Sequence, residues 1–216
     1  MSSSSSSRVV IRVGSILNTD KEYIVNFCDS RSAFPKPGLC RDVFETYPNA
    51  NCYSERLDPT RNSSDPLGTI IQRQSIKAAA KLSDEEKKEQ STNKIRSILH
   101  FIIQKGQSDA DQEANDTSEN RFQWFVQCTQ QLKQIVKQYD TFAFPYRLAS
   151  LWKDKYWPKY EQVLQQLNKE LQEQTNTDTT MIFLYKQTVP SKFNARLQGK
   201  PNARQKTITQ MVENNK

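Results

Sequence analysis

The sequence predicts an α/β protein in which a mixed β-sheet lies between two layers of helices. Short blocks of β-branched and aromatic residues alternate along the chain with segments of helical periodicity. Several strand-like blocks are apolar at nearly every position, which is typical of strands covered on both faces. At 216 residues the chain is long enough to bury one good core, whereas a second full domain would be cramped.

The first half of the chain is predicted to supply four strands and one helix. The string RVVIRV is rich in β-branched residues and YIVNF is short and apolar, so both are expected to be strands. The segment LCRDVFETYP gathers Val43, Phe44 and Tyr47 on one side of a helix that a proline ends. The predicted elements are strands at 8–13, 23–27, 67–73 and 95–105, and a helix at 39–48.

The second half is predicted to supply two longer helices and two strands. The first helix has Thr117 or Ser118 as its N-cap. Its apolar residues recur at helical spacing and form one stripe of Phe125, Cys128, Leu132, Ile135, Val136 and Tyr139. The second helix has a proline in its first turn and an apolar side of Trp157, Tyr160, Val163, Leu164, Leu167 and Leu171. The predicted elements are helices at 121–139 and 157–171, and strands at 141–146 and 180–186.

Composition divides the chain into a body and two terminal segments. Residues 1–7 are a serine run that is predicted to be disordered, and residues 8–186 form the predicted domain, with a charged surface insertion at 74–94. Residues 187–216 contain six Lys or Arg and one Glu, and so carry +5 of the formal net charge of +7. We expect this basic tail to contact nucleic acid, another polyanion or a partner protein, or to act only as a solubilising extension.

The scarcity of histidine and the spacing of the cysteines argue against most catalytic and metal-binding motifs. The chain has one histidine, His100, and four cysteines, Cys28, Cys40, Cys52 and Cys128, with no C-x-x-C pair. We therefore expect no metal site and reduced, mostly buried thiols. His100 alternates with apolar residues in a predicted strand, so we interpret it as a hydrogen-bonded core or surface residue rather than a catalytic one. No nucleophile elbow, Walker loop or H-E-x-x-H motif is present.

The sequence shows no sign of membrane insertion or secretion. No apolar run approaches the length of a membrane-spanning helix, and the first residues lack the apolar stretch of a secretory signal. We accordingly expect an intracellular protein without membrane contact.

Four stretches of the chain carry a resemblance to a known family. VGSI ends the first strand, and PGLCRDVFETYPNA forms a glycine turn with a following helix. DPLGTIIQ and FIIQKGQ are paired strands, and FAFPYRLASLWKDKYWPKYEQVL joins a strand to a tryptophan-containing helix. In this order they resemble the macrodomain family, which binds ADP-ribose, and above all the macro-like proteins of large DNA viruses and phages. The likeness covers residues 8–186 as architecture and implies a three-layer α/β/α domain.

The resemblance implies a ligand groove at the ends of the strands, but this chain departs from the family pattern there. Ser15 stands where the family has an aspartate that accepts from the adenine amino group, and Asp29 or Ser30 stands where it has an asparagine. An aspartate beside a diphosphate repels it unless the carboxylate is paired or protonated. RLASLWKDK replaces the glycines that would wrap the diphosphate. The groove residues implied by the resemblance are Gly14, Ser15, Ile16, Asp29, Gly38, Leu39, Cys40, Pro145, Arg147, Trp152 and Lys153.

The resemblance and its departures together predict a degenerate macrodomain-like binding or scaffold module, located in the cytoplasm, the nucleus or a virion. It would retain at most weak binding of ADP-ribose or a related nucleotide, with no cofactor and no catalysis. Leu148, Leu151 and Trp152 are expected to fill the groove; in an open groove, Arg147 and Lys153 would supply charge. Two alternatives remain. One is an active ADP-ribose-1''-phosphate phosphatase or ADP-ribosyl hydrolase with atypical loops, and the other is a nucleic-acid-associated or structural assembly protein that uses the basic tail.

Overall fold

The computed structural model describes residues 9–35, 37–57, 64–75, 96–105, 116–137, 140–146 and 156–186. The serine run, most of the predicted insertion, residues 147–155 and the basic tail lie outside this described part. The predictions about them, including that of a filled groove, therefore stay predictions.

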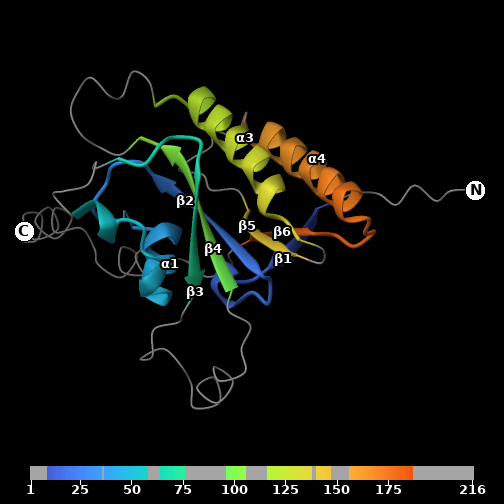
Figure 1. Cartoon of the computed structure of the whole chain (residues 1–216), viewed down its shortest axis with the longest axis horizontal. Helices are drawn as coiled ribbons and strands as arrows, with labels where there is room; N and C mark the ends of the chain where they lie inside the picture. The colour runs from blue at the N-terminus through green and yellow to red at the C-terminus, as the bar shows by residue number, and fades with distance from the viewer. Residues whose placement is uncertain are drawn as a thin grey trace, which may run out of the picture.

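Within the described part, six strands form one mixed sheet with the order β1-β6-β5-β2-β4-β3 (Figure 1). Five of these strands run parallel, and β3 pairs antiparallel with β4. The strands are β1 Val10–Val13, β2 Tyr23–Asp29, β3 Ile70–Ser75, β4 Arg96–Gln104, β5 Phe142–Pro145 and β6 Ile182–Lys186. Each predicted strand is present at its predicted place in the chain, and the mixed sheet is confirmed.

The described helices cover both faces of this sheet. Helices α3 (Ser118–Ile135) and α4 (Trp157–Thr175) lie side by side on one face, and α1 (Leu39–Thr46) lies on the other (Figure 1). Short 3-10 turns accompany α1, namely η1 Ile16–Asn18, η2 Pro48–Ala50 and η3 Ser54–Leu57. None of the described helices combines the length and the apolar character needed to cross a membrane.

The two central strands are buried on both faces, which explains their nearly continuous apolar character. Successive side chains of a strand point to opposite faces, so β2 and β4 contribute to two separate cores. The core under α3 and α4 receives Val25, Phe27, Leu99, Phe101 and Ile103. The core under α1 receives Ile24, Cys28, Ile98 and Ile102. The register places Asn26 opposite His100, on the α1 side.

Helix α3 has one of the two predicted N-caps, begins at Ser118 rather than at residue 121, and ends earlier than expected. The Thr117 hydroxyl accepts a hydrogen bond from the Asn120 backbone N–H at 3.1 Å and so caps the first turn. At the other end the backbone of Val136 is extended, with ψ of 139°. The Asp140 carboxylate accepts from the Lys137 backbone N–H at 2.6 Å, and residues 138 and 139 of the predicted helix lie outside the described part.

Candidate functional site

Most residues of the predicted groove lie at one edge of the sheet. Because β1, β6, β5 and β2 are mutually parallel, their carboxyl ends share that edge. Of the predicted groove residues, this edge or the adjoining start of α1 holds Gly14, Ser15, Ile16, Asp29, Gly38, Leu39, Cys40 and Pro145. The other three, Arg147, Trp152 and Lys153, lie outside the described residues.

Two glycines leave the backbone open at this edge. Gly14 follows β1 with φ of 147°, and Gly38 precedes α1 with φ of 129°. L side chains rarely adopt either conformation. A Cβ atom at either position would meet no atom within 4 Å among the described residues, so both glycines border open space.

Ser15 and Ile16 are engaged within the protein. The Ser15 hydroxyl accepts a hydrogen bond from the Leu17 backbone N–H at 3.2 Å and caps η1. The Ile16 side chain is buried in the core under α1.

Asp29 is buried and paired. One carboxylate oxygen accepts from the backbone N–H groups of Arg31 at 3.1 Å and Ser32 at 2.7 Å, and the other accepts from the Tyr53 hydroxyl at 3.1 Å. The Arg56 guanidinium lies 3.4 Å from the same carboxylate. The unpaired negative charge that would repel a diphosphate is therefore not present at this position.

Arg56 joins two acidic residues and the loop between β2 and α1. Its Nε donates to the Asp65 carboxylate at 2.9 Å, and its terminal nitrogens donate to the Ser32 and Asp29 carbonyl oxygens at 2.8 and 2.7 Å. The guanidinium also stacks over the Tyr53 ring, 4.1 Å from its centroid. These hydrogen bonds attach the beginning of the loop between β2 and α1 to η3, which holds Arg56.

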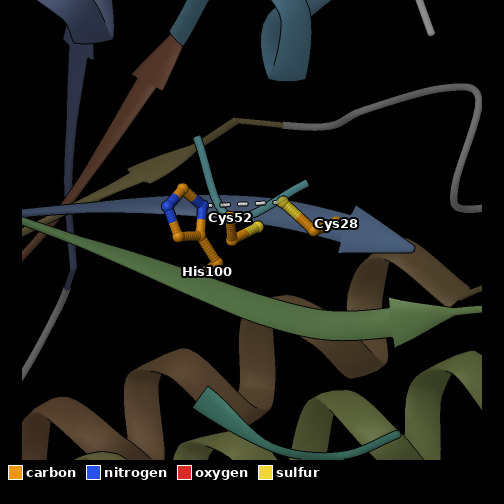
Figure 2. Close-up of side chains that lie close together, drawn as sticks. All are labelled: Cys28, Cys52 and His100. Carbon is orange, nitrogen blue, oxygen red and sulfur yellow. Dashed lines mark hydrogen bonds between the residues drawn. The ribbon is translucent and has the colours of Figure 1, made fainter. Parts of the chain in front are cut away.

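Directly beneath the same edge, on the α1 side of the sheet, thiol groups gather around the one histidine. Cys28 comes from β2, His100 from β4 and Cys52 from the turn after η2, and their ligand atoms lie within 4.8 Å of one another. Figure 2 shows that all three side chains lie on the side of β2 and β4 away from α3 and α4. Cys40, in the first turn of α1, places its sulfur 3.7 Å from that of Cys28.

Two consecutive residues of β2, Cys28 and Asp29, both face the α1 side. In a regular strand they would point to opposite faces. The pairing of β2 with β4 shifts register between these two residues, and such irregularities re-aim side chains. The bulge therefore brings the thiol cluster and the Asp29–Arg56 network next to each other, with Tyr53 contacting both.

His100 is fully buried and its two ring nitrogens have different environments. Nε2 lies 2.7 Å from the Ala50 carbonyl oxygen, so it carries the proton and donates. Nδ1 is thereby left as an acceptor, 3.5 Å from the Cys28 sulfur and 3.2 Å from the Asn26 amide nitrogen. Burial lowers the pKa of His100 to about 3, which keeps the ring neutral. Of the predicted core or surface position, the structure shows the core one, with a hydrogen bond through Nε2.

The thiols of Cys28 and Cys40 differ in acidity and access. Burial raises the pKa of the Cys28 thiol well above its ordinary value. The hydrogen bond from Cys28 lowers the pKa of Cys40, whose side chain is only half-buried. Cys28 is thus an unsuitable nucleophile, since the thiolate is the reactive form and this sulfur is both protonated and enclosed.

Sequence reasoning missed Asn26, Cys52, Tyr53 and Arg56 as members of this region. The available signal was Asn26, a polar residue in an otherwise apolar strand, two positions before Cys28 and so on the same face. The other three follow α1 in a polar segment, where nothing in the sequence indicates that they return to the sheet.

A separate groove of about 560 Å³ lies on the outer surface between α3 and α4. It is lined by residues of both charges, including Glu119, Lys133, Lys159 and Glu170, and by polar and apolar side chains between them. The two helices that line it lie on the opposite face of the sheet from α1 (Figure 1), and none of its lining residues belongs to the predicted groove.

Comparison with known proteins supports the fold class. No protein-family model and no curated protein matches the chain, whereas 18 chains of solved structures do. One is the X-ray crystal structure of a protein from Bacteroides thetaiotaomicron, which is 12% identical with a TM-score of 0.50, and the match covers 82% of this chain and 99% of that one. Another, Alphavirus P23pro-zbd, is 15% identical with a TM-score of 0.40; the match covers 88% of this chain and 23% of that one. At such low identity, the likeness to the Bacteroides protein shows a distant relationship of fold alone.

Proposed function

We propose that this chain is a macrodomain-like binding module that takes ADP-ribose or a related nucleotide at the carboxyl edge of its sheet, without catalysing a reaction. The six-stranded mixed sheet with helices on both faces is compatible with the family that the sequence resembles. The observation that carries the proposal is the pair of glycines, Gly14 and Gly38, which border open space at that edge. Glycines in such conformations let backbone N–H groups approach a phosphate closely.

The charges near the edge favour this proposal. Asp29 was the residue expected to repel a diphosphate, and its carboxylate is instead held by Tyr53, Arg56 and two backbone N–H groups. With that charge compensated, an anionic ligand approaching Gly38 meets no exposed carboxylate from Asp29.

Phe34 offers an aromatic surface to such a ligand. It lies in the loop between β2 and α1, four residues before Gly38, and its side chain is 72% exposed. A large exposed aromatic side chain is a suitable platform for stacking a nucleobase. We assign the adenine of the ligand to this side chain rather than to Ser15, because the Ser15 hydroxyl caps η1 and carries no charge.

A binding role is favoured over catalysis because the candidate acid–base groups near the edge are already engaged. His100 is enclosed and hydrogen-bonded through Nε2, and the Asp29 carboxylate is paired on both oxygens. Neither of these two residues is placed to exchange a proton with a ligand.

The proposal is tested by calorimetric titration of the full chain with ADP-ribose. We expect weak, saturable binding, and Phe34→Ala should weaken it about tenfold, because stacking contributes about 1–3 kcal/mol per base. Ile11→Ala is the matched control, since Ile11 is also an exposed apolar residue but lies within β1. The Ile11→Ala variant should bind ADP-ribose with the same affinity as the unmodified chain. Absence of heat at millimolar ADP-ribose would overturn the proposal, as would equal effects of the two substitutions.

A further inference from the structure

We propose that Cys28, Cys52 and His100, with Cys40 as the fourth ligand, form a binding site for Zn²⁺ between the sheet and α1. The site is distinct from the proposed nucleotide edge and does not depend on it. Its ligands come from β2, β4, the first turn of α1 and the turn after η2, so a bound ion would join four segments that are far apart in the sequence.

Two separations between the proposed ligand atoms are those that tetrahedral zinc requires. With Zn–S near 2.3 Å and Zn–N near 2.0 Å, tetrahedral geometry sets sulfurs about 3.8 Å apart and a sulfur about 3.5 Å from a nitrogen. The sulfurs of Cys28 and Cys40 are 3.7 Å apart, and the Cys28 sulfur is 3.5 Å from His100 Nδ1. The Cys52 sulfur lies within 4.8 Å of the Cys28 and His100 ligand atoms. Cysteine and histidine in this number form a common set of structural zinc ligands.

The imidazole of His100 is already oriented as a metal ligand. Histidine ligands generally donate their second ring N–H to a carbonyl or carboxylate, which settles the tautomer and the ring orientation. Here Nε2 donates to the Ala50 carbonyl oxygen at 2.7 Å, and Nδ1 presents its lone pair toward the sulfurs. A histidine that served only to fill the core would not need this alignment with two thiols.

The side chain of Asn26 contacts three of the four proposed ligand atoms. Its amide nitrogen lies 3.2 Å from His100 Nδ1, 3.4 Å from the Cys28 sulfur and 3.7 Å from the Cys40 sulfur. A single donor thus serves three acceptors, as a cation would. Within the described part of the chain, the side-chain oxygen of Asn26 (Oδ1) is buried and has no hydrogen-bond partner. An arrangement that leaves a buried oxygen unpaired is costly, and a bound ion would allow the amide to turn toward other partners.

The burial of the ligands and their number indicate a structural ion rather than a catalytic one. Cys28, Cys52 and His100 are buried, while Cys40 is half-buried and gives the cluster contact with the surface. Four protein ligands leave no open position for water or substrate. The ion would hold the start of α1 against the ends of β2 and β4.

The experiment measures metal in the full chain, purified under reducing conditions without metal-affinity steps. We expect about one Zn²⁺ per chain by elemental analysis. Replacement by Co²⁺ should give the absorption bands of a tetrahedral, thiolate-bound ion. X-ray absorption of the zinc-loaded chain should show three sulfurs and one nitrogen, a measurement that requires no substitution.

The matched variants are single cysteine-to-serine changes. Cys28→Ser, Cys40→Ser and Cys52→Ser should each reduce retained zinc at least tenfold in the presence of a competing chelator. Cys128→Ser should retain zinc fully, because Cys128 is an equally buried thiol on α3, on the other side of the sheet. Asn26→Ala should also retain it, since the amide is not a ligand.

Three outcomes would overturn the proposal. The first is a folded, reduced chain that takes up no zinc from a buffered excess. The second is equal zinc retention by Cys40→Ser and Cys128→Ser together with an absorption spectrum that lacks sulfur ligands. The third is a metal-free chain isolated with a Cys28–Cys40 disulfide that forms in place of metal uptake. Because each readout concerns the metal, none depends on whether ADP-ribose binds.

Discussion

Replacing Arg56 with alanine should lower the free energy of unfolding by about 3–5 kcal/mol, the cost typical of removing one partner from a buried ion pair. The Arg56 side chain is buried, as is Asp29, and it also bonds Asp65 and two backbone carbonyl groups. Without the guanidinium, Asp29 would keep a negative charge away from water with only hydrogen bonds to stabilise it. Arg56→Lys should lose part of this energy, because lysine keeps the charge but lacks the planar fork that serves several acceptors.

Urea unfolding at constant pH and ionic strength measures this effect. Arg73→Ala is the matched control, since Arg73 also forms an ion pair, with Glu55, but both side chains are partly exposed to water. Exposed pairs of this kind contribute roughly 0–1 kcal/mol. A loss for Arg56→Ala no larger than that for Arg73→Ala would show that the Asp29–Arg56 network is not essential to the loop before α1.

Replacing Asn168 with alanine should lower the free energy of unfolding by about 2–6 kcal/mol, since it leaves two buried donors unpaired at a cost of about 1–3 kcal/mol each. Asn168 is fully buried on α4. Its side-chain oxygen accepts from the backbone N–H groups of Met181 at 2.9 Å and Ile182 at 3.0 Å. It therefore holds the start of β6 to the helix that precedes it, and alanine would leave both N–H groups without this acceptor.

Thermal and urea unfolding of Asn168→Ala are compared with those of Gln166→Ala. Gln166 lies two positions earlier on the same helix, is exposed, and bonds only Glu170 one turn later among the contacts described for it. Its replacement should change stability by less than about 0.5 kcal/mol. Equal losses for the two variants would mean that water or a rearranged backbone satisfies the start of β6.

The order of strands and helices could be predicted because each element carries its own pattern. Val43, Phe44 and Tyr47 repeat at helical spacing and pack together under α1. Phe125, Cys128 and Leu132 do the same under α3. The spacing of apolar residues is a local property of the sequence. It therefore predicts each helix or strand without knowledge of what that element packs against.

Positions whose role depends on a distant partner could not be predicted in the same way. On α4, helical spacing predicts Val163 on the buried side, but its side chain is only partly buried. Asn168, which the spacing of apolar residues does not include, is fully buried. The sequence pattern predicts that an asparagine in a helix faces solvent, whereas here Asn168 accepts from the backbone N–H groups of Met181, just before β6, and Ile182, its first residue. The prediction that no metal site exists depends on the absence of short cysteine spacings, and it stays a prediction that the zinc measurements will test.

The sequence by itself determined the α/β class, the succession of elements and the enclosure of β2 and β4 on both faces. Each of these follows from burying apolar side chains at a regular period. Only the tertiary structure decided which polar groups meet beneath the carboxyl edge. There Asp29 is compensated by Arg56, and His100 lies beside Cys28 although 72 positions separate them. Contacts of that kind depend on which strands pair and on one shift of register between β2 and β4. Neither of these produces a periodic pattern of apolar residues in the sequence.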